Sequence, residues 1–191
     1  MRLTIAFILL VCFVYTAVGQ TGTYRFKATA GASGTIAVRQ FNKQIRGDVF
    51  VWWHTASATN GSFSGKGLLQ NNTCSLRSAD DADCTVKLTF NKNELKAAFG
   101  NCMANNLPED FSGVYKKITD NLPGEYRIAA GKAYFYKTAG TNVRLKTYLI
   151  KGNKVSVDIE NITDNNWVFI NFTNAAGKVT SGYLPWTALK L

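Results

Sequence analysis

The chain has 191 residues, of which 46% are hydrophobic and 13% aromatic, and its formal net charge is +10. This length is enough for one large domain or two small ones. Without residues 1–19, which contain Arg2, the charge is +9, divided as +5 over residues 20–118 and +4 over residues 119–191. Because DNA-binding proteins usually concentrate lysine and arginine on one stripe, this spread predicts no specific nucleic-acid partner. It favours instead a weak attraction to anionic envelope polymers.

The first twenty residues have the three parts of a signal peptide. Arg2 supplies the positive charge, residues 3–14 are almost continuously apolar, and Ala17-Val18-Gly19 provides the small residues of a cleavage site. The apolar run is shorter than the ~20 residues that a membrane-spanning helix needs, so an uncleaved anchor is the weaker alternative. We therefore expect Gln20 to be the first mature residue of a periplasmic or secreted protein. No later segment is long and apolar enough to span a membrane.

The first half of the chain has the pattern of an all-β protein. Short runs rich in β-branched and aromatic residues alternate with Gly, Asn, Ser and Thr at roughly eight- to twelve-residue intervals. The expected strands are 23–28, 35–41, 48–55, 67–76, 84–90, 95–99 and 113–116. We expect them to form an antiparallel β-sandwich or barrel over residues 20–118.

Trp52, Trp53 and His54 lie together near the end of one expected strand. Adjacent strand residues face opposite sides, so one tryptophan is expected in the core. The other either faces solvent as a binding anchor or packs between domains. His54 is the only histidine in the chain, and a catalytic triad or a Cys-His pair would have to use it. Because no partner for it is identifiable, we expect a structural role.

Other catalytic and metal-binding motifs are not found in the sequence. It contains no HExxH, no CxxC and no glycine-rich phosphate loop. The acidic run Asp80-Asp81-Ala82-Asp83 lacks the glycine and the closing glutamate of a calcium loop, so a solvated loop is expected. We predict a non-enzymatic protein without metal or cofactor.

Three cysteines follow the predicted signal peptide: Cys74, Cys84 and Cys102. An odd number in an oxidising compartment predicts one disulfide and one free thiol. Residues 84–90 and 95–99 both alternate and flank a turn at residues 91–94, which brings Cys84 opposite residue 101 or so. A bulge at Gly100 would absorb the offset. We predict the pair Cys84–Cys102, with Cys74 buried; the alternative is Cys74–Cys84.

A domain boundary is expected near residues 119–124, where polar residues, Pro123 and Gly124 come together. Beyond it, five short strands are expected, at 133–136, 147–150, 155–159, 167–172 and 179–184, with glycine turns at Gly152 and Gly177. So many short strands in about seventy residues predict a small β-barrel over residues 122–191.

This second half contains three segments whose order and spacing are informative: YLIKGNKV, NNWVFINFTN and GKVTSGYLPWTAL. Together they resemble the bacterial SH3-like domains of envelope proteins. In that family a Lys-Gly-x-x-Val turn (here Lys151 to Val155) precedes a tryptophan strand (Trp167), and a Gly-aromatic-Leu step (Gly182 to Leu184) closes the barrel. The chain departs from the family at its opening strand, which is often of Asn-Val-Arg type and here is Tyr134-Phe135-Tyr136. The resemblance implies binding, often to cell-wall peptides in support of another domain, rather than catalysis.

The second half therefore supplies the candidate binding residues. Five aromatic side chains are expected to line one shallow face: Tyr134, Tyr136, Trp167, Tyr183 and Trp186. Flat aromatic surfaces contact peptides and sugars with little loss of conformational entropy. The alternative is that the large rings, Trp167 and Tyr183 above all, fill the core of the small barrel.

In the first half, the hairpin from Cys84 to Cys102 and the segment Gly113-Val114-Tyr115-Lys116 resemble secreted β-domains of lysozyme inhibitors and related envelope proteins. The sequence thus predicts a secreted binding protein that recognises cell-wall peptide or glycan. The alternative is an immunity or inhibitor protein that blocks a secreted toxin or cell-wall hydrolase across a surface shared by both domains. The net positive charge disfavours a basic lysozyme as its target.

Overall fold

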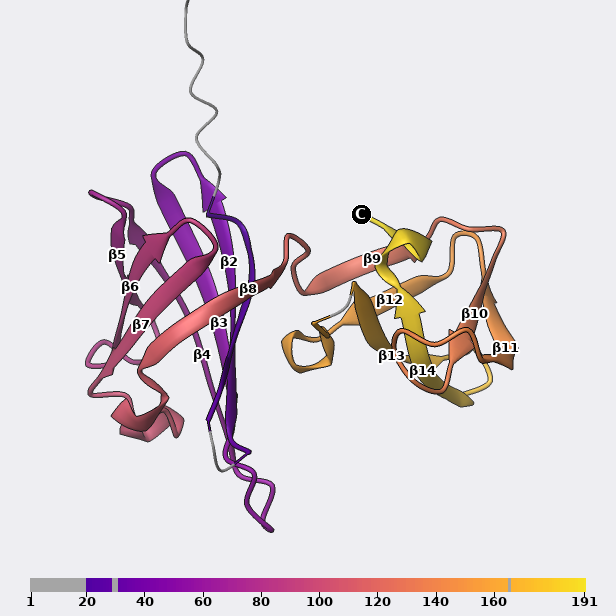
Figure 1. Ribbon diagram of the computed structural model, residues 1–191, viewed down its shortest axis with the longest axis horizontal. Helices are drawn as coiled ribbons and strands as arrows, with labels where there is room; N and C mark the ends of the chain where they lie inside the picture. Colours follow the sequence, from indigo (N-terminus) through magenta and orange to yellow (C-terminus); the bar gives the residue numbers. More distant parts are fainter. Residues whose placement is uncertain (1–19, 29–30, 165) are drawn as a thin grey trace, which may run out of the picture.

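The computed structural model describes residues 20–28, 31–164 and 166–191 (Figure 1). The predicted signal peptide, residues 1–19, lies outside these ranges. Strands β1 to β8 form one body and strands β9 to β15 a second body beside it. Within the described ranges, no helix is long and apolar enough to cross a membrane.

The first body is a closed antiparallel barrel in which each strand pairs with its neighbours in chain order. Its strands are β1 (Gly22–Lys27), β2 (Ser33–Phe41), β3 (Gln44–Trp52), β4 (Asn60–Leu68), β5 (Thr73–Arg77), β6 (Thr85–Asn91), β7 (Glu94–Gly100) and β8 (Gly113–Thr119). Pairing of β1 with β8 closes the barrel, with a register shift next to Thr23. The prediction of an all-β fold with an N-terminal sandwich or barrel is confirmed, and the structure selects the barrel.

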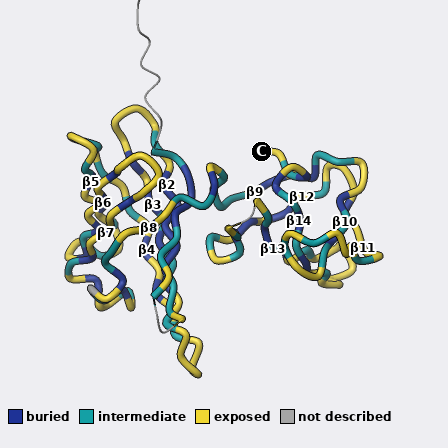
Figure 2. The backbone as a smooth tube through the Cα atoms, in the orientation of Figure 1, coloured by how far each residue is buried: buried dark blue, intermediate teal, exposed yellow. Residues whose placement is uncertain are grey.

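Side chains fill the interior of the barrel, and buried residues alternate with more exposed ones along β5, β6 and β7 (Figure 2). The largest of them come from β1, β4, β6, β7 and β8: Tyr24, Phe63, Phe90, Phe99 and Tyr115. A buried tyrosine needs a partner for its hydroxyl group. Tyr24 donates to the carbonyl oxygen of Gln20 and Tyr115 to that of Phe111, in each case four residues back, which pins the segment that leads into the strand.

The disulfide joins Cys84 to Cys102, as predicted, and Cys74 is a buried free cysteine. The bond closes the open end of the β6–β7 hairpin, just beyond the last pair, Thr85 and Gly100. The predicted bulge at Gly100 is wrong. The offset is taken up instead by Asn101, whose φ of 58° lies in the left-handed region that asparagine tolerates.

The predicted strand 67–76 is also wrong. It spans the end of β4, a turn and all of β5 except Arg77, and the strand 60–68 was missed. β4 has the sequence NGSFSGKGL, whose glycines give it a poor strand pattern. A Cβ atom at Gly67 would lie 2.3 Å from the carbonyl oxygen of Ser75, and one at Gly61 would lie 2.4 Å from that of Asn106. These glycines therefore let neighbouring backbone segments approach β4 closely.

The second body consists of two sheets around a separate hydrophobic core. One sheet has the order β11-β10-β14-β13 and the other the order β12-β9-β15. The strands are β9 (Gly124–Ile128), β10 (Lys132–Tyr136), β11 (Arg144–Ile150), β12 (Lys154–Val157), β13 (Trp167–Thr173), β14 (Val179–Pro185) and β15 (Leu189–Lys190). Five of these strands were predicted; β9 and β15 were missed. The predicted strand 155–159 ends at Val157, and a 3-10 turn, η3 (Ile159–Asn161), follows it.

The segment between β8 and β9 contains the predicted domain boundary. It is held at both ends, because Thr23 Oγ1 of the barrel donates to the carbonyl oxygen of Asn121 and Tyr126 Oη of the second body donates to that of Leu122. The two hydrophobic cores share no residue. Assignment of the second body to the SH3-like family stays a prediction.

Candidate binding surfaces

The outer face of the four-stranded sheet carries most of the predicted aromatic residues. Alternation along β10 buries Ala133 and Phe135 in the core and leaves Tyr134 and Tyr136 on the opposite side. Six aromatic side chains occupy this side, and we call them the aromatic face: Tyr134, Tyr136, Tyr148, Trp167, Phe169 and Tyr183. Strand register brings them together, since Tyr136 is opposite Tyr183, and Tyr183 is opposite Phe169.

The rings of the aromatic face contact one another in pairs. The ring centroids are 5.3 Å apart for Tyr134 and Tyr148, 4.9 Å for Tyr136 and Trp167, and 5.1 Å for Phe169 and Tyr183. Tyr148 is 42% exposed, and the other five are half-buried. Mutual packing therefore holds the side chains in place while each ring keeps part of its surface in solvent.

Trp186 does not belong to this face. It lies in a 3-10 turn after β14, is only 7% exposed and packs in the core against Tyr126, with 5.4 Å between ring centroids. The sequence places it two residues beyond Leu184, where strand alternation would keep it on the buried side. The turn that follows Pro185 preserves that inward direction.

Two residues of the aromatic face, Tyr148 and Phe169, were not predicted. Phe169 follows Trp167 by two residues and therefore shares its side of β13. Tyr148 is opposite Tyr134 on β11. The period-two rule identifies the first from the sequence, whereas the second depends on a register that is shifted by an irregularity between Tyr134 and Tyr136.

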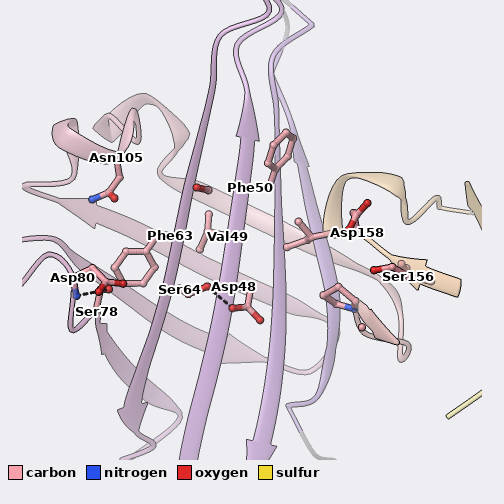
Figure 3. A pocket seen from close by; sticks show the side chains of 15 residues that line it. Asp48, Val49, Phe50, Phe63, Ser64, Ser78, Asp80, Asn105, Ser156 and Asp158 are labelled. Atoms are coloured by element: carbon pink, nitrogen blue, oxygen red, sulfur yellow. Dashed lines mark hydrogen bonds between the residues drawn. The ribbon is translucent and has the colours of Figure 1, made fainter. Parts of the chain in front are cut away.

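A second surface lies where the barrel meets the second body. A groove of about 630 Å³ runs between β3 and β4 of the barrel and the segment 156–159 of the second body. In Figure 3, Ser156 and Asp158 come from the second-body segment beside the barrel, and together with Val49 and Phe50 they line this groove. Phe50 also lines an adjoining hollow of about 510 Å³ that includes Trp52, so the two hollows neighbour each other along the outer wall of the barrel, and we call them together the groove.

The larger part of the groove is acidic although the chain is basic. Its lining includes Asp48, Asp80 and Asp158 and no lysine or arginine. Asp48 accepts a hydrogen bond from Ser64 at 2.6 Å, and its carboxylate remains partly exposed (Figure 3).

The two adjacent tryptophans face opposite sides of the barrel wall, as predicted. Trp52 is 39% exposed in the groove wall, whereas Trp53 packs against the barrel core.

Next to Trp52, His54 contacts its indole edge to face at 4.7 Å between ring centroids. It lies beyond the end of β3 with a φ of 56°. This contact is a packing interaction, and His54 is not among the residues that line the groove.

An ion-pair cluster ties the two bodies together beside the groove. Asp164 of the second body accepts hydrogen bonds from Arg25 at 2.6 Å and from Lys27 at 2.8 Å, both on β1. Arg25 also donates to the carbonyl oxygen of Ile162. Burial by itself would raise the pKa of Asp164, but the hydrogen bond from Lys27 and the charge of Arg25 outweigh it and lower that pKa.

Replacing Asp164 with asparagine is expected to lower the melting temperature slightly at neutral pH and not at all in strong acid. A pKa below the ordinary value of 3.8 means that the carboxylate stabilises the folded chain above that pH, and this stabilisation is lost as the pH falls through the lowered pKa. Because Asp164 is 38% exposed, we expect the effect to stay below about 1 kcal/mol.

Thermal unfolding of the wild type and of Asp164→Asn between about pH 2 and pH 7 measures this difference. Asp110→Asn is the control, since Asp110 is exposed and takes part in none of the ion pairs found among the described residues. A difference between the two variants that persisted at the acid end would contradict the assignment.

Comparison with known proteins does not place the chain in a family. No family model, no curated protein sequence and no solved structure matches it significantly. Its function is therefore argued from the two surfaces alone.

Proposed function

We propose that this chain is a secreted, non-enzymatic binding protein that recognises cell-wall peptide or glycan through the aromatic face. The observation that supports this proposal is the packing of six half-buried or exposed aromatic rings on one side of a single sheet. The intramolecular disulfide is compatible with an extracytoplasmic location.

Aromatic rings suit this task for two physical reasons. Each offers a flat apolar surface on which the C–H side of a sugar or the plane of a peptide bond stacks, and tyrosine adds a hydroxyl group for hydrogen bonding. Because the rings on this sheet already pack against one another, binding immobilises few additional rotamers. The polar residues Asn171 and Ser181, joined by a 2.7 Å hydrogen bond, continue the same side of the sheet beyond Phe169.

Co-sedimentation of the mature protein with purified peptidoglycan sacculi tests the proposal. Tyr136→Ala and Tyr183→Ala are each expected to weaken binding by about tenfold, as for removal of an aromatic anchor from a binding surface. Binding by the wild type should largely survive moderate salt, because a purely ionic attraction between exposed charges is screened.

Phe41→Ala is the matched control, since Phe41 is a 73% exposed aromatic residue on the barrel, away from the aromatic face. We expect it to bind like the wild type. Equal binding by all three variants and the wild type would remove the aromatic face from the proposal. The absence of any sedimentation with sacculi, even at low salt, would argue against wall recognition altogether.

A second candidate function, an inhibitor or immunity protein, is favoured by the groove between the two bodies. An interface across both bodies is what this function requires, and the exposed Trp52 in the groove wall is a good anchor for a partner protein. The aspartates of its larger part also give that part a local charge opposite to that of the whole chain. A protein partner that is captured by the wild type and by Tyr136→Ala, but not by Trp52→Ala, would favour this function.

A further inference from the structure

The four-stranded sheet of the second body carries basic residues and no acidic ones. Residues 129–157 and 165–191 contain no aspartate or glutamate, so the four strands of the sheet that carries the aromatic face, the β10–β11 turn and the β13–β14 turn are free of acidic residues. The same sheet and its turns carry six exposed basic residues: Lys132, Lys137, Arg144, Lys146, Lys151 and Lys178. Most of the acids of this body lie at 158–164, the segment that faces the barrel.

Two of the basic side chains belong to the aromatic face itself. The guanidinium group of Arg144 lies 4.5 Å from the ring centroid of Tyr134, and the ammonium group of Lys132 lies 4.7 Å from that of Tyr148. Such stacking fixes the cation over the ring while its N–H groups remain available at the edge. Within the part of the chain that the structure describes, neither Arg144 nor Lys132 takes part in an ion pair. Both positive charges are therefore available to a ligand.

We infer that the ligand of the aromatic face is an acidic polysaccharide, whose sugar rings stack on the tyrosines while its anionic groups bind Arg144 and Lys132. This inference rests on the proposed function and specifies its ligand. Charge complementarity supports it, because an acid-free sheet with six cations attracts a polyanion and repels a polycation. Arg144 offers the forked donors that pair with a carboxylate or a sulfate.

A single-stranded nucleic acid is the other polyanion that stacks on aromatic rings beside cations. The disulfide disfavours it, because such bonds persist in oxidising compartments, where polysaccharides are the usual extended polyanions. The hydroxyl and amide groups of Asn171 and Ser181 next to the rings also suit the many hydroxyl groups of a sugar chain. We therefore argue for the glycan and treat the nucleic acid as an outcome of the test.

The experiment compares two polymers with the same sugar backbone, one anionic and one uncharged: polygalacturonate and its fully methyl-esterified form, with immobilised mature protein at low and moderate salt. We expect the acidic polymer to bind at least about tenfold more tightly than the ester, with the difference shrinking as salt rises. The double variant Lys132→Gln/Arg144→Gln should lose roughly tenfold or more of its affinity for the acid and little of its affinity for the ester. Lys87→Gln/Lys96→Gln, two exposed lysines of β6 and β7, removes the same charge from the barrel and should bind like the wild type.

Each other result overturns the inference. Three results would each show that the acidic groups are not recognised at this face. They are equal binding of the two polymers, an equal loss of affinity in both double variants, and binding of the protein to sacculi but not to polygalacturonate. In those cases the proposed recognition of wall material stands on the sacculus experiment. Tighter binding of a single-stranded oligonucleotide than of polygalacturonate would identify nucleic acid as the ligand. Failure to bind sacculi and both polymers would remove the proposed function together with the inference.

Discussion

Replacing Trp186 with alanine is expected to lower the free energy of unfolding of the second body by about 3–5 kcal/mol, the usual range for removing a large aromatic side chain from a core. Trp186 is 7% exposed and packs edge to face against Tyr126. Its loss leaves a cavity between the two sheets, which the short strands β9 and β15 close on one side. Urea unfolding followed by far-UV circular dichroism measures the change.

Two matched variants make this prediction specific. Trp167→Ala removes the same side chain from the aromatic face, where it is half-exposed, and should cost clearly less stability. Trp186→Phe keeps a ring against Tyr126 and eliminates Nε1 of Trp186, which is buried without a hydrogen-bond partner among the described residues. An unpaired buried donor costs about 1–3 kcal/mol, so the phenylalanine variant should be destabilised by less than about 2 kcal/mol. A Trp186→Ala protein as stable as the wild type would contradict the core assignment.

The parts of the fold that were predictable from sequence share a physical cause. Strands with one side in the core and one in water alternate every second residue, and β6 and β7 do so without interruption. Their register follows from a two-residue turn, so the disulfide partner of Cys84 follows as well. The local pattern and the tertiary structure agree in this hairpin.

The parts that escaped prediction depend on contacts distant in sequence. The glycines of β4 obscure its alternation, and their value appears only where Ser75 and Asn106 approach them. β15 has two residues and exists as a strand because it pairs with β9, about sixty residues earlier in the chain. No local pattern reports either contact.

The candidate site likewise has residues that the local pattern predicts and residues that it does not. Alternation places Tyr134 and Tyr136 together on one side of β10, and it gives Trp167 a side of β13. The sequence alone does not say which side of each strand faces the core. Trp186 was assigned to that surface because it is aromatic and near a strand end, whereas a turn directs it inward. Along the chain the positive charge is spread over both halves. The fold places six of the nine basic residues of the second body on the four-stranded sheet and its turns, and it turns the segment 158–164 toward the barrel.

Replacing Cys84 and Cys102 together with alanine is expected to lower the free energy of unfolding of the barrel by about 3 kcal/mol. The two cysteines are separated by 18 residues in sequence, and the entropy that this loop regains in the unfolded chain gives that magnitude. Both residues are buried, so two small cavities add to the loss. Urea unfolding of the double variant beside the wild type, under non-reducing conditions, measures the difference.

Cys74→Ala is the control, because Cys74 is equally buried and forms no disulfide. Burial raises the pKa of its thiol, so little thiolate is present at neutral pH and exchange with the disulfide should be slow. We expect this variant to lose less stability than the double variant, because it lacks one buried sulfur atom and no covalent bond.

For the double variant, hydrogen exchange followed by mass spectrometry should place the loss of protection in β1 to β8 and leave β9 to β15 unchanged, because the two bodies have separate cores. Equal destabilisation by Cys74→Ala and the double variant would mean that side-chain packing, rather than the covalent loop, accounts for the effect of the disulfide. Loss of protection in both bodies would mean that they unfold as one unit, joined through Asp164 and its partners on β1.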